Sequence, residues 1–249
     1  MRGVIDLFSE KSDLYALARP RYPEELFDFI ASRSPACTRA WDCGAGNGQA
    51  AVSLAARFAE VCASDVSREQ IAHAIATPNV CYSVQPAERT DYPARHFDAI
   101  CVAQALHWFD FAPFFDEVVR VARPGALFAA WGYCWPAISP EFDATFKAAL
   151  RDVIEPWWAP QNRLLLDAYA DVPFPFPRVQ APPMQIVVHW TLPQFMAYIR
   201  TWSATRRCEA EEGDEFLASA ASALSAAWGD PDVARIISMP LVTLAGRIP

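Results

Sequence analysis

The chain has almost no lysine and no long apolar run. Lys11 and Lys147 are the two lysines in 249 residues, and 29 acidic residues against 21 basic ones give a formal net charge of −8. Nucleic-acid binding depends largely on cationic side chains at phosphates, so this balance argues against a DNA or RNA partner and against an anionic membrane surface. Gly132 and Pro136 interrupt the longest apolar stretch, which leaves no run near the ~18 residues of a transmembrane helix.

Patterns typical of secretion, disulfides and metal sites are also missing. No basic segment followed by an apolar one opens the chain, so we expect no signal peptide and a cytoplasmic protein. The cysteines are odd in number and form no C-x-x-C pair, and the histidines show no metal-ligand spacing. The cysteines are at positions 37, 43, 62, 81, 101, 134 and 208, and the histidines at 73, 96, 107 and 189. We therefore expect small buried cysteines in a reducing compartment, and no metal.

Glycine is scarce, with nine in the chain, yet three of them alternate in one short loop. Gly44, Gly46 and Gly48 follow Asp42, with an apolar run before them and an alanine-rich amphipathic run after them. The pattern predicts a strand, a tight turn and a helix. Because glycine has no Cβ, such a turn can adopt positive φ angles and let a ligand lie against the backbone, while the helix N-terminus offers unpaired N–H groups. The loop therefore predicts a nucleotide-type ligand.

An acid at the end of a second predicted strand supports this ligand. Asp65 lies about 20 residues beyond the glycines, where a doubly wound fold places a carboxylate on ribose hydroxyls. Ser67 and Gln70 form a capping box for the next helix, so Asp65 is not needed as its cap. A dinucleotide-binding loop spaces its glycines G-x-G-x-x-G, and here Gly48 comes one position early. This spacing disfavours a pyrophosphate-binding loop without excluding one.

Apolar runs of five to eight residues alternate with helical patterns through the first half of the chain. The predicted strands are 39–43, 60–65, 80–84, 97–103 and 126–133. This alternation predicts an α/β doubly wound fold whose parallel sheet is covered on both faces. After Tyr133 the pattern changes to a helix at 141–154, a proline-rich stretch at 173–183, a strand at 185–191, helices at 194–203 and 214–228, and a last strand at 241–248.

Six separated blocks within residues 15–133 carry a resemblance to a known family. They are Tyr15-x-x-x-Arg19-Pro-Arg-Tyr-Pro23, Asp42 to Gly48, Asp65, Gln85-Pro-Ala87-Glu88 before Phe97-Asp98, Ala103-Gln-Ala-Leu-His-Trp-Phe-Asp110, and Arg120-Val-Ala-Arg-Pro-Gly125 leading into Leu127 to Tyr133. Their order and spacing resemble a class I S-adenosylmethionine-dependent methyltransferase of the small-molecule branch that includes trans-aconitate methyltransferase-like proteins. Ala126 stands where the family usually has a second glycine and Cys43 where it often has leucine, and neither departure affects cofactor binding.

The resemblance implies a Rossmann-like, mainly parallel seven-stranded sheet with a helical cap inserted in the C-terminal half. We expect one domain over residues 1–249. Its parts are an N-terminal arm at 1–23, a cofactor-binding core at 24–135, the cap and late sheet elements at 136–239, and the last strand at 240–249.

The resemblance also implies S-adenosylmethionine as the cofactor and assigns it residues. The backbone of Gly44, Ala45 and Gly46 would hold the methionine part, Asp42 would face its amino group, and Gln104 and Ala105 would lie near the methionine end. Asp65 with Val66 would take the ribose, and Ala87 and Glu88 would border the adenine. Tyr15, Arg19 and Trp108 would complete the site.

Methyl transfer from a sulfonium is an in-line displacement that needs no metal, so the protein mainly holds the acceptor and the methyl group in line. A carboxylate acceptor is already ionised and needs no base, but a cation must orient it, preferably an arginine. The candidate arginines are Arg19, Arg21, Arg200 and Arg206. Arg19 lies in the first family block, and Arg200 lies in a weaker C-terminal resemblance, Tyr198-Ile-Arg-Thr-Trp-Ser203. For a hydroxyl or amine acceptor, His107 is the candidate base, although packing beside the cofactor is the favoured interpretation of this residue. We expect Trp202 and other aromatic residues of the C-terminal half to line the acceptor pocket.

Three hypotheses follow from the sequence. The favoured one is methylation of a small carboxylate-bearing or aromatic metabolite, with a carboxylate oxygen as one candidate acceptor atom. No Asn-Pro-Pro-Tyr-like tetrad occupies positions 104–107, which disfavours methylation of amino groups on nucleobases or protein glutamine. An NAD-dependent oxidoreductase and a non-catalytic protein that binds S-adenosylmethionine are the alternatives. The sequence is compatible with a monomer or a homodimer.

Overall fold

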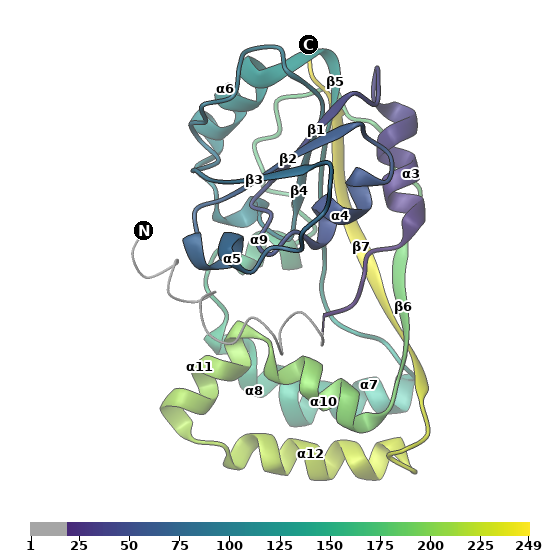
Figure 1. The fold of residues 1–249 in the computed structure, drawn as a ribbon. Helices are drawn as coiled ribbons and strands as arrows, with labels where there is room; N and C mark the ends of the chain where they lie inside the picture. Colours follow the sequence, from purple (N-terminus) through teal and green to yellow (C-terminus); the bar gives the residue numbers. More distant parts are fainter. Residues whose placement is uncertain (1–18) are drawn as a thin grey trace.

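A seven-stranded sheet forms the centre of the computed structural model, which describes residues 19–249 (Figure 1). The strands are β1 (Arg39–Cys43), β2 (Glu60–Asp65), β3 (Val80–Val84), β4 (Phe97–Ala103), β5 (Ala122–Tyr133), β6 (Gln185–Trp190) and β7 (Arg235–Arg247). Their order is β3-β2-β1-β4-β5-β7-β6; the first five are parallel, and β7 runs antiparallel to β5 and β6. The predicted mainly parallel, doubly wound sheet is confirmed, and its strand order reverses between β1 and β4, where such folds bind ligands.

Helices cover both faces of the sheet because strand β5 is apolar on both sides. Trp131 packs on one face against Phe27, with ring centroids 6.0 Å apart, whereas Phe128 packs on the other face against Phe114, 6.1 Å away. Successive strand residues point to opposite faces, so one continuous apolar run serves two cores. The helices of these two layers include α3 (Glu24–Arg33), α4 (Gln49–Ala55), α5 (Arg68–Ala72), α6 (Phe111–Val121) and α9 (Asn162–Leu166).

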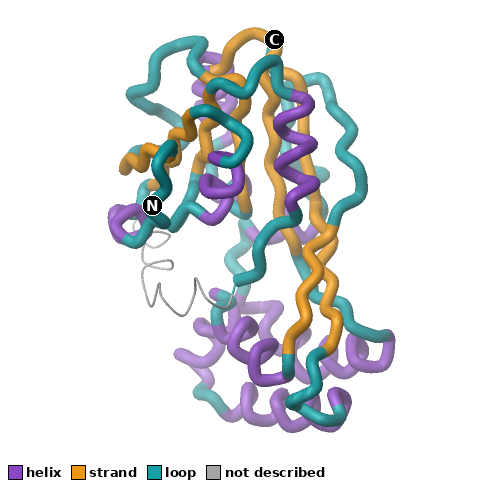
Figure 2. Tube along the Cα trace, turned by 45° about the vertical axis from the view of Figure 1, so that its right-hand side comes forward, coloured by secondary structure: helices purple, strands orange, loops and turns teal. Residues whose placement is uncertain are grey.

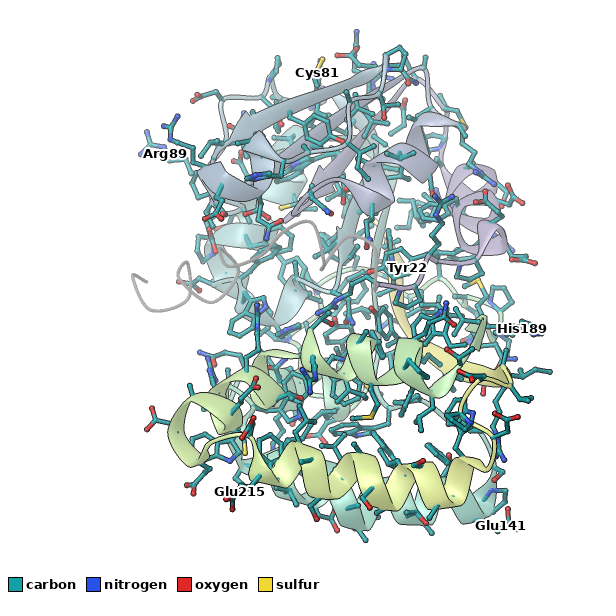
Figure 3. The ribbon with its side chains drawn as sticks, turned by 60° about the horizontal axis from the view of Figure 1, so that its bottom comes forward. Tyr22, Cys81, Arg89, Glu141, His189 and Glu215 are labelled. Carbon is teal, nitrogen blue, oxygen red and sulfur yellow. The ribbon has the colours of Figure 1, made fainter. Side chains whose placement is uncertain are left out.

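A second layer of helices lies below the carboxyl edge of the parallel strands, and the long strands β6 and β7 run down to it (Figures 1 and 2). We call this layer the cap. It comprises α7 (Pro140–Phe146), the π-helical turn η3 (Lys147–Arg151), α8 (Asp152–Ile154), the 3-10 turn η4 (Glu155–Trp157), α10 (Leu192–Arg200), α11 (Ser203–Glu212) and α12 (Glu215–Trp228). Its own apolar core stacks Phe142 against Phe195 and Trp228, with centroids 5.8 and 5.4 Å apart. Tyr22 lies between sheet and cap (Figure 3).

Several predicted element limits are corrected. The last strand begins at Arg235 rather than at residue 241, because β6 pairs with its first half. The predicted helix at 194–203 runs instead from Leu192 to Arg200 as α10, and the next helix, α11 from Ser203 to Glu212, was not predicted. Cys37 and Cys81, expected to be buried, are exposed. Cys81 lies on the edge strand β3, far from the cap (Figure 3). The proline-rich stretch 173–183 has no regular helix, as predicted. Within residues 19–249 no helix is both long and apolar enough to cross a bilayer.

A buried carboxylate joins three strands at the edge of the sheet opposite the cap. Asp98 is 1% exposed; its Oδ2 accepts from the N–H groups of Thr38 (2.9 Å) and Arg39 (3.0 Å), and Oδ1 accepts from Arg123 at 2.7 Å. These contacts tie the start of β1 to β4 and β5. Removing such a group leaves its charged partner and two backbone donors unpaired.

We therefore expect Asp98→Ala to lower the free energy of unfolding by roughly 3 kcal/mol. The matched control is Glu60→Ala, which breaks the half-exposed Arg39–Glu60 pair (2.7 Å) and should cost less than about 1 kcal/mol. Urea unfolding of both variants measures the difference. Equal losses would show that Asp98 does not hold the strands together.

Candidate active site

The glycine loop is a tight turn fastened to the neighbouring strand. Gly44, Gly46 and Gly48 all adopt positive φ angles, of 69°, 56° and 89°. The N–H groups of Gly44 and Ala45 donate to the Ser64 carbonyl of β2, at 2.8 and 3.0 Å. Left-handed backbone at three alternating positions suits glycine alone among the common residues, so the predicted strand, turn and helix are confirmed.

The three glycines differ in what surrounds them. A Cβ at Gly44 would lie 2.7 Å from the Cβ of Ala105, and one at Gly48 would overlap the Tyr82 hydroxyl. A Cβ at Gly46 would meet nothing nearer than Gln70 Oε1 at 3.8 Å. Gly44 and Gly48 are therefore required by protein packing, whereas Gly46 leaves its open side to a ligand.

Asp65 braces this turn from the end of β2. Its Oδ2 accepts from the N–H of Gly46 at 2.9 Å, and its Oδ1 accepts from the N–H of Ser67 at 2.8 Å. Burial raises the pKa of Asp65, and the hydrogen bonds from these backbone amides oppose the rise. Ser67 Oγ accepts from the N–H of Gln70 at 3.2 Å, as the predicted helix cap requires. Each Asp65 oxygen keeps a lone pair, so the carboxylate can brace the loop and still accept from a ribose hydroxyl.

Asp42 is a buried acid without a counter-charge. It is fully buried, and neither carboxylate oxygen has a hydrogen-bond partner among the described residues. Loss of hydration raises the pKa of Asp42 to about 7; the nearby backbone N–H of Ala51 lowers the pKa in part, and the negative charge of Asp65 adds a smaller rise. An unpaired buried carboxylate is costly, and a cationic ligand group would relieve it. The site therefore fits the ammonium group of a bound methionine moiety.

Two cavities meet beside the glycine loop. The first, about 700 Å³, is lined by Tyr22, Gly44, Ala45, Gly46, Asn47, Gln49, Ala50, Gln70, Ala103 and Ala105, and we call it the loop cavity. The second, about 800 Å³, lies between the sheet and the cap, and we call it the cap cavity. Arg19, Gln104, Trp108 and Tyr133 line both. A ligand in the loop cavity and a ligand in the cap cavity would thus touch the same four residues.

The cap cavity has aromatic walls and cationic borders. Its rings include Trp135, Trp158, Tyr198 and Trp202, whose centroids are 5.6 Å (Trp135 to Trp202), 6.1 Å (Trp158 to Trp202) and 5.3 Å (Tyr198 to Trp202) apart. Arg19 and Arg206 line it, while the described part of its lining contains no aspartate or glutamate. The cavity suits an apolar molecule that carries negative charge.

His107 lies in the wall of the cap cavity, on the sheet side. The imidazole is 4% exposed, and its Nε2 lies 3.4 Å from the side-chain nitrogen of Asn162. Loss of hydration lowers the pKa of His107 to about 4, so the ring is neutral at physiological pH. Sequence reasoning missed Asn162, because α9 follows a stretch of chain without a recognisable motif. Proximity to His107 is visible only in the fold.

Asp42, Asp65 and the remaining predicted cofactor residues lie outside the lining of the loop cavity. Val66 is 50% exposed and Ala87 is buried. Glu88 Oε1 accepts from the N–H of Asp110 at 3.1 Å, which attaches the predicted adenine border to the start of α6. Tyr15 lies outside the described residues.

The predicted acceptor arginines require a correction. Arg200 is exposed and lies outside the cap cavity, and Arg21 is exposed as well. Tyr198 of the same helix does line the cavity, and a residue two positions later points about 200° away around the axis. Arg206, on the next helix, takes the place predicted for Arg200. Trp202 lines the cavity as expected.

Known proteins resemble this chain in sequence and in fold. Residues 41–130 match the family model described as a methyltransferase domain. A Dictyostelium discoideum protein named "Putative methyltransferase" is 32% identical over 205 residues, covering 80% of this chain and 77% of that protein. The chain belongs to the methyltransferase family. A solved "Putative Type II Methyltransferase" from Anaeromyxobacter dehalogenans is 41% identical, with a TM-score of 0.87, and covers 92% of this chain and 98% of that one.

A more distant structure shows the same fold. Geranyl diphosphate C-methyltransferase from Streptomyces coelicolor, solved with S-adenosyl-L-homocysteine, has a TM-score of 0.51 at 12% identity and covers 100% of this chain and 97% of that one. The methyltransferase is a class I enzyme that uses S-adenosylmethionine, and the NAD-dependent alternative is set aside. The trans-aconitate-like branch stays a prediction.

Gly46 offers a test of the loop cavity with a matched control. Gly46→Ala and Gly125→Ala both place alanine at positive φ (56° and 77°), which costs about 1 kcal/mol each, and neither new Cβ meets a protein atom within 3.4 Å. We expect only Gly46→Ala to weaken binding of S-adenosylhomocysteine, by at least about tenfold, in isothermal titration. Equal affinities for the cofactor product would place the ligand elsewhere.

Asp42 predicts that cofactor binding depends on pH. A cationic ligand requires the ionised acid, and with a pKa of about 7 most Asp42 is protonated at pH 5 to 6. We expect affinity for S-adenosylhomocysteine to rise as pH increases to about 7, by at most tenfold per unit, with release of a proton on binding. Asp42→Asn should flatten this dependence. An unchanged pH profile in Asp42→Asn would contradict the assignment.

Proposed function

We propose that the enzyme methylates a small carboxylate-bearing molecule with an aromatic or apolar body. The observation that carries the proposal is the lining of the cap cavity: Arg19 and Arg206 border it, aromatic rings form its walls, and its described lining holds no acid. Guanidinium groups bind carboxylates well, since their donors match the two oxygens. The net charge of −8 supports a small substrate rather than a nucleic acid.

The chain's residues divide the work between the two cavities. When bound, S-adenosylmethionine supplies an activated methyl group, which a nucleophile attacks in line. The glycine loop, Asp42 and Asp65 hold the cofactor, and Gln104 and Trp108 lie where the two cavities meet. The aromatic walls of the cap orient the acceptor, which is the main source of rate in such a displacement.

The neutral ring of His107 acts in this scheme as a packing and hydrogen-bonding group. Its pKa of about 4 makes the imidazole a weak proton acceptor at neutral pH. The site therefore relies on orientation more than on general base catalysis. A cytoplasmic location and a monomeric or homodimeric state remain predictions from the sequence.

The role of Arg206 in binding the substrate carboxylate, which we call the Arg206 anchor, is tested with Arg206→Met and, as the matched control, Arg200→Met. Both remove one guanidinium from neighbouring cap helices, but only Arg206 lines the cap cavity. Benzoate, phenylacetate and 3-phenylpropanoate are titrated into the complex with S-adenosylhomocysteine. We expect Arg206→Met to weaken the best-binding acid about tenfold or more, and Arg200→Met to change it less than about twofold. Equal binding by the wild type and Arg206→Met would refute the anchor.

A further inference from the structure

Buried polar atoms that lack a hydrogen-bond partner gather in the lining of the cap cavity. Among its described residues these are Gln104 Oε1, His107 Nδ1, Trp158 Nε1 and Asn162 Oδ1. Native proteins pair nearly all buried polar groups, because an unpaired one loses its hydration without compensation. Their concentration at a single cavity points to a ligand that supplies the missing partners.

The two walls of the cavity offer opposite hydrogen-bonding chemistry. On the cap side, the indole N–H of Trp158 and the guanidinium of Arg206 can only donate. On the sheet side, the buried carbonyl oxygen of Gln104 can only accept, while Nδ1 of His107 donates when Nε2 of that ring accepts from Asn162. The cavity is therefore built for a molecule with an acceptor-rich end, such as a carboxylate, and a hydrogen-donating end.

The carbonyl of Gln104 has a fixed direction. Its side-chain nitrogen donates to the Tyr133 carbonyl at 3.2 Å, and because that carbonyl only accepts, the amide cannot be turned round. Its backbone N–H donates to the Trp131 carbonyl at 2.8 Å, and its φ of 55° is rare outside glycine. A Cβ at residue 132 would overlap Gln104 Oε1, so Gly132 provides the space for this placement. Strained backbone held by several contacts is typical of functional sites.

Gln104 also lines both cavities, so the acceptor atom must come near it to meet the methyl group. A carbonyl oxygen attracts an N–H or O–H group and repels a carboxylate oxygen. We propose that Gln104 selects an acceptor whose reacting atom carries a hydrogen, an amine or a hydroxyl, and that the substrate's carboxylate binds on the cap side without being methylated. This inference rests on the proposed function and replaces the sequence hypothesis of carboxylate methylation.

The proposed transfer is balanced without a further reactant. The nitrogen or oxygen lone pair forms a bond to the methyl carbon, the carbon–sulfur bond breaks, and its electron pair stays on sulfur. The hydrogen that faced Gln104 then leaves as a proton to water. An amine can lose that proton after the product is released, whereas a hydroxyl must lose it during transfer.

The experiment uses matched sets of acids bound to the full-length protein with S-adenosylhomocysteine. Benzoate, phenylacetate and 3-phenylpropanoate vary the length, and each is compared with its para-hydroxy and para-amino derivative. For at least one length we expect a derivative to bind about tenfold more tightly than its parent acid. The para-hydroxy and para-amino arms distinguish the two kinds of acceptor. Parent acids that bind as tightly as both derivatives at every length would overturn the proposal.

Two variants locate this preference. Gln104→Met removes the carbonyl at similar size, and Gln104→Asn keeps a residue that tolerates positive φ but withdraws the carbonyl by one methylene. We expect either variant to bring the derivative-to-parent ratio near one while binding of the parent acid stays within about threefold. Gln180→Met, at an exposed position, should keep the wild-type ratio. A ratio that persists in both Gln104 variants would contradict the assignment.

Product chemistry separates this inference from the proposed function. With labelled S-adenosylmethionine and the best-binding derivative, we expect base-stable label in an ether or an N-methyl group. Base-labile label in a methyl ester would overturn the inference but leave the Arg206 anchor standing. If no acid of any length binds, or if binding is indifferent to Arg206→Met, the proposed function itself fails.

Discussion

The attachment of the glycine turn to strand β2 is the constraint on which the site depends. The Ser64 carbonyl accepts from Gly44 and Ala45, and Asp65 accepts from Gly46, so the left-handed turn is fixed to β2 by three hydrogen bonds. Register between β1 and β2 sets these contacts, since Cys43 lies opposite Ser64. The sheet therefore prepares the loop for a ligand before any ligand arrives, which reduces the entropy that binding must overcome.

Electrostatics divides the site into two parts. Below the loop, Asp42 is an acid that requires a cation, and on the cap side Arg206 is a cation that suits an anion. At the junction of the two cavities, Gln104, Trp108 and Tyr133 are uncharged and Arg19 carries a positive charge. A cationic donor would be directed toward Asp42 and an anionic acceptor toward Arg206, with Arg19 beside the place where the two meet.

Local chemistry explains how much of this the sequence could predict. The alternating glycines and the capping box at Ser67 are patterns within short segments, and they predict a turn and a helix start. The contacts that require Gly44, Gly48 and Asp65, with Ala105, Tyr82 and Gly46, form across the fold. Arg200 and Arg206 could not be ranked, because the choice depends on where α10 ends and which way α11 points. The Gln104 carbonyl, set by Tyr133 and Gly132, and the contact of His107 with Asn162 depend on pairings across the fold that no spacing in the chain reveals. Cys81 was misjudged for the same reason, since edge and central strands read alike in sequence.

The arrangement of the two cavities is tested most directly by a crystal structure of the protein with S-adenosylhomocysteine bound. The account predicts the amino group of the ligand beside Asp42, its homocysteine chain along Gly44 and Gly46, its ribose on Asp65, and its sulfur facing the junction at Gln104. A ligand seated instead among the aromatic rings of the cap, with the glycine loop uncovered, would contradict it.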